Sequence, residues 1–116
     1  MLVRKFQKEL NAGIVSLVLL AILERSDEPL YGYQIAKQLE AASNDGMPIK
    51  QGTLYPVLRS LEDNGLLSGR VEPSVSGPPR KYYRITEEGR RVLGEWQVTW
   101  TRTRDFVNET LEGNRD

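Results

Sequence analysis

A run of apolar residues near the start of the sequence constrains the fold more than any other feature. From Ile14 to Leu23 every residue except Ser16 is apolar, and Glu24 and Arg25 follow directly. Ten residues are too few to span a bilayer, which needs about 20. The run also lacks the small-residue cleavage site of a signal peptide. A helix that is apolar on nearly all sides belongs at the centre of a domain. We therefore predict a buried helix over residues 11–25 and no signal or membrane segment.

The composition excludes several classes of protein. A chain of 116 residues is the size of one domain. It contains no cysteine and no histidine, which excludes disulfides, cysteine nucleophiles, histidine-based or cysteine-based metal sites and Ser-His triads. The acidic pairs Glu62-Asp63 and Glu87-Glu88 are typical of solvated helix ends, and no glycine-rich phosphate loop is present. We expect no enzyme activity, no cofactor and no metal.

The sequence predicts two more helices before a hairpin. A helix over 31–42 follows Pro29, because small and apolar residues recur there at helical spacing. A third helix is predicted over 53–64, with Thr53 as its N-cap. Pro56 then falls in the first turn, where no intrahelical hydrogen bond is lost. Gly65 is a natural left-handed stop.

A β-hairpin is expected next. The strands are predicted over 66–72 and 80–85, and a tip rich in proline and glycine joins them. Strand alternation places Tyr83 on one face and Tyr82 on the other. Alternating strand tyrosines are more often packed in a hairpin core, although a stacking platform for single-stranded nucleic acid is the alternative.

The last predicted helix runs over 87–111, with Thr86 as its N-cap. Its 25 residues make about 37 Å of helix, whereas a domain near 100 residues has a radius of gyration of only about 13 Å. The helix must therefore project from its domain while carrying an apolar stripe, which favours a two-fold pair of such helices. The apolar residues Leu2, Val3, Phe6 and Leu10 are expected to pack on that pair.

Three helices followed by a hairpin is the order of a winged-helix domain, whose second and third helices form a helix-turn-helix. The stretches LYGYQIAKQLE, QGTLYPVLRSLEDNGLL and GPPRKYYRITEEGRRVL resemble the signature stretches of the PadR family of bacterial transcriptional regulators. This resemblance implies a cytoplasmic, homodimeric, DNA-binding repressor of the short subclass, associated with the nucleoid when bound. Members of this family often sense a small molecule. The predicted fold is mostly α with a small β-hairpin. It comprises a winged helix-turn-helix domain over 1–86 with an N-terminal helical extension, a long C-terminal dimerisation helix over 87–112 and a frayed tail over 113–116.

The candidate DNA-binding residues lie around the third helix and the hairpin. Residues 50–84 carry six basic and three acidic side chains, a net charge of +3 in a chain that is neutral overall. Recognition helices read base edges with their N-terminal residues, so Lys50 suits guanine and Gln51 suits adenine. Thr53 suits a phosphate, an N-cap role, or both. The wing cations suit phosphates or the minor groove, or else form a solvated edge. The predicted DNA-binding residues are Tyr33, Lys50, Gln51, Gly52, Thr53, Tyr55, Arg59, Arg80 and Lys81.

A second set of residues is expected at an effector site or a dimer interface. It comprises Phe6, Leu10, Val92, Leu93, Trp96, Trp100 and Val107. Two symmetry-related tryptophans suit a flat aromatic effector, as some PadR-like proteins bind between their dimerisation helices, or they simply pack together. The expected partners are double-stranded DNA, a second copy and a small aromatic effector, with no membrane. The alternative function is a winged-helix protein–protein interaction module without sequence-specific DNA binding, which the zero net charge favours.

Overall fold

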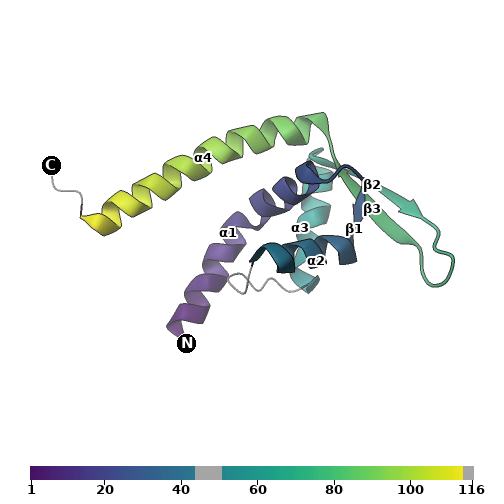
Figure 1. Ribbon diagram of the computed structural model, residues 1–116, viewed down its shortest axis with the longest axis horizontal. Coiled ribbons are helices and arrows are strands. Elements are labelled where there is room, and N and C mark those ends of the chain that lie inside the picture. Colours follow the sequence, from purple (N-terminus) through teal and green to yellow (C-terminus); the bar gives the residue numbers. More distant parts are fainter. Residues whose placement is uncertain (44–50, 114–116) are drawn as a thin grey trace.

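Four helices and a three-stranded antiparallel sheet make up the part of the chain that the structure describes, residues 1–43 and 51–113 of a computed structural model (Figure 1). The elements in chain order are α1 (Leu2–Arg25), β1 (Leu30–Tyr31), α2 (Gly32–Ser43), α3 (Gln51–Asp63), β2 (Leu67–Glu72), β3 (Arg80–Ile85) and α4 (Glu87–Glu112). The predicted fold class, mostly helical with a small hairpin, is confirmed.

Helix α1 joins the predicted N-terminal helical extension to the predicted helix over 11–25, and its two halves differ in environment. In the C-terminal half, Val15, Leu19, Leu20 and Leu23 are buried at the centre of the core. In the N-terminal half, apolar side chains such as Phe6 remain exposed. Within the described residues, α1 is the one helix long and apolar enough to cross a membrane. The domain core accounts for the apolarity of its C-terminal half, as predicted.

The helix-turn-helix is preceded by a short strand that the sequence did not reveal. Tyr31 was expected in the second helix, but Leu30 and Tyr31 pair with Tyr83 and Tyr82 to give the sheet order β1-β3-β2. Pro29 disfavours helix immediately before it, and β3 supplies hydrogen-bond partners for an extended segment after it. Helix α2 consequently begins at Gly32.

Helix α3 begins at Gln51, so the predicted N-cap role of Thr53 is wrong. Pro56 lies inside the helix, where its missing N–H removes one hydrogen bond to Gly52. The helix tolerates this loss because Leu54, Leu58 and Leu61 bury its inner face in the core. The predicted stop is confirmed. Gly65 is left-handed (φ 79°), and the backbone N–H groups of Gly65 and Leu66 donate to carbonyls in the last turn of the helix.

The hairpin of β2 and β3 forms the wing, and Gly69 pairs with Tyr83 in its register. Tyr83 and Ile85 are buried against the helices, whereas Arg84 is exposed. This confirms the predicted alternation and the packed role of Tyr83. Tyr82 lies edge-on to the Tyr31 ring.

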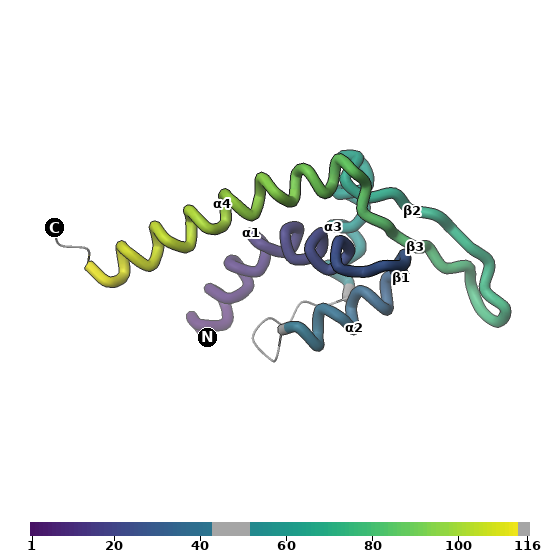
Figure 2. The backbone as a smooth tube through the Cα atoms, turned by 45° about the horizontal axis from the view of Figure 1, so that its top comes forward, coloured from purple at the N-terminus to yellow at the C-terminus, as the bar shows by residue number. Residues whose placement is uncertain are grey.

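Helix α4 starts in the domain and then leaves it. The Thr86 hydroxyl accepts a hydrogen bond from the Gly89 N–H at 2.9 Å, which confirms the predicted N-cap. The first turns of α4 pack on α1, and the C-terminal half extends away from the domain (Figures 1 and 2). The helix ends at Gly113, a left-handed cap. This projection gives the chain a longest dimension of 62 Å.

Candidate nucleic-acid interface

A groove of about 370 Å³ opens where the start of α2, the outer side of α3 and strand β3 meet. It is lined by Tyr31, Gly32, Tyr55, Arg59, Pro79, Arg80, Lys81 and Tyr83. Arg59 stands on α3 and Arg80 on β3, so two elements far apart in sequence supply its cations. Within the described part of the chain, neither arginine forms an ion pair. Both guanidinium groups are therefore available to an anionic partner.

Arg80 is held in place by an aromatic cluster. Its guanidinium carbon lies 4.5 Å from the centroid of the Tyr31 ring. The Tyr31 ring in turn packs edge-on against Tyr82, with 5.3 Å between ring centroids. Stacking on an aromatic face restricts a guanidinium without using its N–H donors. Tyr31, absent from the predicted binding residues, thus orients one of them, and only its pairing with β3 could have revealed this.

Lys81 differs from the two arginines, because a carboxylate on α3 engages it. Its Nζ donates to the Glu62 Oε1 at 2.7 Å. The hydrogen bond to Glu62 is the main reason that the pKa of Lys81 is raised above its ordinary value. From the sequence, Lys81 is predicted to bind DNA and Glu62 to be a solvated acid. Opposite charges 19 positions apart give no local signal of their pairing.

Of the two predicted aromatic residues, Tyr55 lines the groove and Tyr33 does not. Tyr55 on α3 and Tyr33 on α2 are both exposed. Gly32 lies against the Tyr55 ring, so closely that a Cβ atom there would stand 2.7 Å from the tyrosine hydroxyl. Lys37 Nζ lies 5.7 Å from the centroid of the Tyr33 ring. The absence of a side chain at Gly32 therefore makes room for the Tyr55 ring.

The remaining predicted DNA-binding residues lie at the start of α3. Gln51 is the first residue of the helix. Gly52 and Thr53 follow it, and both are exposed. Lys50 lies outside the described residues. Gln51, Gly52 and Thr53 thus occupy the N-terminal end of α3, the end that reads base edges in helix-turn-helix proteins.

The second predicted set is divided between the domain core and two exposed helix faces. Leu93 is buried in the core of the chain, and Val92 and Trp96 pack against that core. Trp100 and Val107, further along α4, are 39% and 44% exposed. The same holds for Phe6 and Leu10 on α1, which are 64% and 43% exposed.

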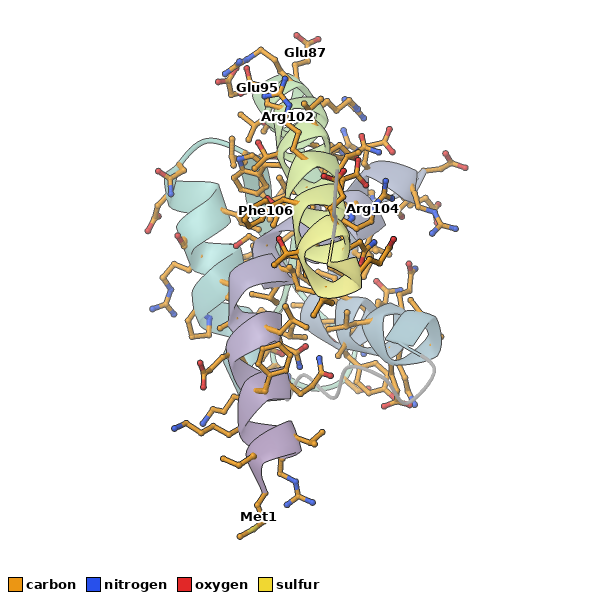
Figure 3. The ribbon with its side chains drawn as sticks, turned by 90° about the vertical axis from the view of Figure 1, so that its left-hand side faces the viewer. Met1, Glu87, Glu95, Arg102, Arg104 and Phe106 are labelled. Atoms are coloured by element: carbon orange, nitrogen blue, oxygen red, sulfur yellow. The ribbon has the colours of Figure 1, made fainter. Side chains whose placement is uncertain are left out.

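Charged residues occupy the other side of α4. Figure 3 looks at α4 from its C-terminal end, with Glu87, Glu95 and Arg102 on the side turned away from α1. Arg91 forms ion pairs with Glu88 and Glu95 on this side. The helix is therefore amphipathic along its projecting part, where no segment among the described residues covers the apolar side.

No group of three acidic residues suited to a metal ion occurs within residues 1–43 and 51–113.

A helix-turn-helix and a two-stranded wing, with arginines in the groove between them, define a winged-helix protein. Residues 19–95 match the model of the transcriptional regulator PadR-like family, and this chain belongs to that family.

Solved structures and characterised relatives agree with this assignment. A PadR family transcriptional regulator from Eggerthella lenta is 41% identical, with a TM-score of 0.84 over 97% of this chain and 95% of that one. A transcriptional regulator of Mycobacterium tuberculosis is 37% identical over 60% of this chain and 62% of its own length. The negative transcriptional regulator PadR of Bacillus subtilis is 24% identical over 73% of this chain and 46% of its own length. The family and these relatives are transcriptional regulators, not enzymes.

Proposed function

We propose that this protein binds operator DNA as a dimer and represses transcription in the cytoplasm, associated with the nucleoid when bound. The observation that carries the proposal is the groove between α3 and the wing, where Arg59 and Arg80 face an open space without acidic partners among the described residues. A DNA backbone passing between the major and minor grooves carries the anions that such a space suits.

The geometry supports a definite mode of binding. The first turn of α3, with Gly52 and Thr53, enters the major groove and reads base edges. Arg59 and Arg80 stand on the two walls of the groove and hold the intervening phosphates. The wing then lies over the minor groove. The +3 charge of residues 50–84 supplies the local attraction that a neutral chain otherwise lacks.

Two uncovered apolar helix faces support the dimer. They belong to the N-terminal half of α1, with Phe6 and Leu10, and to the projecting half of α4, with Trp100 and Val107. Apolar helix faces of this kind are buried by a partner, and a second copy offers the same two faces under two-fold symmetry. Such a dimer places two α3 helices on half-sites one DNA turn apart, about 34–36 Å. The negative regulator among its relatives supports repression by operator occupancy.

An effector site at the dimer interface completes the proposal. Trp96 and Trp100 stand one helical turn apart on the apolar side of α4, and Trp96 lies nearer the domain. A planar aromatic effector stacked between two copies of these rings would change the separation of the reading heads. Packing alone is the competing role. Replacement of Trp96 by alanine should abolish effector affinity, and unchanged affinity would leave packing as its only role.

The decisive experiment is fluorescence anisotropy of a labelled duplex from upstream of the protein's own gene, compared with a scrambled duplex at several salt concentrations. We expect salt-dependent binding that prefers the upstream duplex by about 10³ or more. Equal, weak binding to both duplexes would place the operator elsewhere. A lack of binding to either duplex at low salt would refute DNA binding and favour the protein-interaction module.

A further inference from the structure

The contact between Glu62 and Lys81 joins two parts of the DNA-binding surface, helix α3 and strand β3, through their side chains. Glu62 lies near the end of α3, and Lys81 lies on β3 near the loop that joins the two wing strands. Their side chains meet at 2.7 Å, across 19 positions of sequence. Both are partly shielded, with Glu62 26% and Lys81 42% exposed. The pair is thus a direct bridge from the recognition helix to the wing.

Strand β2 has a gap that lets the bridge form. Gly69 pairs with Tyr83, the next residue beyond Lys81 on the same face of the hairpin. A Cβ atom on Gly69 would stand 2.5 Å from the Lys81 Cε and 2.8 Å from the Glu62 Oε2. Gly69 has no left-handed φ, so its backbone conformation does not demand glycine. What its position requires is the space through which the lysine reaches the carboxylate.

Two neighbouring groups act on Lys81 in opposite directions. The Lys81 Nζ lies 5.5 Å from the centroid of the buried Tyr83 ring. Arg59 lies close enough to disfavour the lysine charge, yet the hydrogen bond to Glu62 outweighs this repulsion. Glu62 therefore offsets the charge of Lys81 and leaves Arg59 and Arg80 as the groove cations without acidic partners among the described residues.

We propose that Glu62 and Lys81, meeting across Gly69, form a latch that fixes the wing against the recognition helix, with Lys81 bound to Glu62 rather than to DNA. The proposal rests on the proposed DNA binding for its consequence and on the geometry of the chain for the latch itself. Glu62 is a positioning residue in this account, because it acts through the wing and touches no nucleotide. The phosphate contact of the wing falls to Arg80.

The first test measures the motion of the wing without DNA. Backbone order parameters of β2 and β3 are recorded by NMR relaxation for the wild type, E62Q and E72Q. Glu72 makes an ion pair with Arg70 inside β2, so E72Q removes a charge of the same sign, and breaks an ion pair of the hairpin, without changing α3. We expect E62Q to lower the order parameters of the wing and E72Q to leave them unchanged. Equal order parameters in all three proteins would overturn the latch.

A second variant opens the latch without changing any charge. G69A inserts a methyl group against the two side chains, both of which are flexible enough to move aside. We expect it to lower the wing order parameters as E62Q does. If G69A leaves them at the wild-type level while the melting temperature stays the same, the bridge does not hold the wing.

The third test counts phosphate contacts with a non-specific duplex. The plot of log K against log salt has a negative slope, and each lost contact reduces the magnitude of that slope by about 0.9 per protomer. We expect R80M to lower the slope by this amount and K81M to leave it unchanged. An equal decrease in K81M would mean that Lys81 leaves Glu62 for a phosphate, which would overturn the latch in the complex. If the wild type binds no duplex, the proposed function fails. The order parameters of the wing still show whether the bridge from Glu62 to Lys81 holds the wing against α3.

Discussion

Gly89, in the first turn of α4, lies directly against the backbone carbonyl of Leu66. A Cβ atom on Gly89 would overlap the Leu66 carbonyl oxygen and would stand 2.7 Å from the Ile85 side chain. The same junction is tied by the Thr86 hydroxyl, which donates to the Gly65 carbonyl at 2.7 Å. The end of α3, the wing and the start of α4 thus meet at one point, where only glycine fits.

Replacement of Gly89 by alanine should therefore destabilise the protein. Because the obstructing atom belongs to the backbone, the helix has to shift, and we expect a loss of about 2 kcal/mol in the free energy of unfolding. Gly94 lies five residues further along α4 with nothing near its would-be Cβ, and it is the matched control. Gly94→Ala should be neutral or stabilising by up to about 1 kcal/mol. Urea unfolding at equal protein concentration measures both values, and equal effects would contradict the junction.

Replacement of Val107 by glutamate should weaken the proposed dimer. The substitution places a charge on the apolar side of the projecting helix, where burial against a second copy would desolvate it. Val98 is exposed on the opposite side of α4, so Val98→Glu adds the same charge outside the interface. We expect sedimentation equilibrium to give a dissociation constant at least tenfold higher for Val107→Glu only. Similar constants for the two variants would place the interface elsewhere.

Replacement of Arg59 by methionine should reduce DNA affinity without changing sequence preference. A phosphate contact carries no sequence information, so affinities for the upstream and scrambled duplexes should fall by similar factors. The magnitude of the negative slope of log K against log salt should decrease by about 0.9 per protomer. Arg104 lies near the C-terminal end of α4, and Arg104→Met is the charge-matched control. It should leave the slope unchanged. A loss confined to the upstream duplex would instead indicate base readout by Arg59.

The stability of the protein should decrease in alkaline solution, partly because of Tyr83. Burial raises the pKa of Tyr83 above its ordinary value of 10.0. Above pH 10 the unfolded chain therefore loses this proton more readily than the folded one, and the free energy of unfolding falls as the pH rises. The raised pKa of Lys81 acts in the same direction above pH 10.5.

Urea unfolding between pH 8 and pH 11 tests this expectation. The free energy should decline above pH 10 in the wild type and decline less in Tyr83→Phe, which has no proton to lose. Tyr33→Phe changes an exposed ring and serves as the control. An identical decline in Tyr83→Phe and the wild type would exclude Tyr83 as a cause.

The main helices and the wing followed from patterns that are local in the sequence. The helical spacing of Leu54, Leu58 and Leu61 predicted the buried side of α3, and Gly65 predicted its end. Strand β1 did not follow, because two residues show no periodicity and their conformation depends on pairing with Tyr82 and Tyr83. The start of α3 was misplaced because a local rule for Pro56 took no account of the packing that offsets its lost hydrogen bond.

The candidate site was predictable in its residue types but not in its contacts. Arg59, Arg80 and Lys81 were all identified as cations of one region. The sequence could not separate them, since the partner that engages Lys81 comes from another element. Only the distance from Lys81 to Glu62, and the stacking of Arg80 on Tyr31, distinguish a bridged cation from an oriented one.

The sequence by itself determined the central helix, the helix-turn-helix, the alternation of the wing and the capped start of α4, because periodicity and capping act over a few neighbouring residues. Tertiary structure decided which cations lack acidic partners among the described residues, which glycines are needed for close approach and how far α4 stays with its own domain. These outcomes depend on distances between elements, such as those that join Glu62 to Lys81 and Gly89 to Leu66. Such distances are set when the helices and the wing pack around α1.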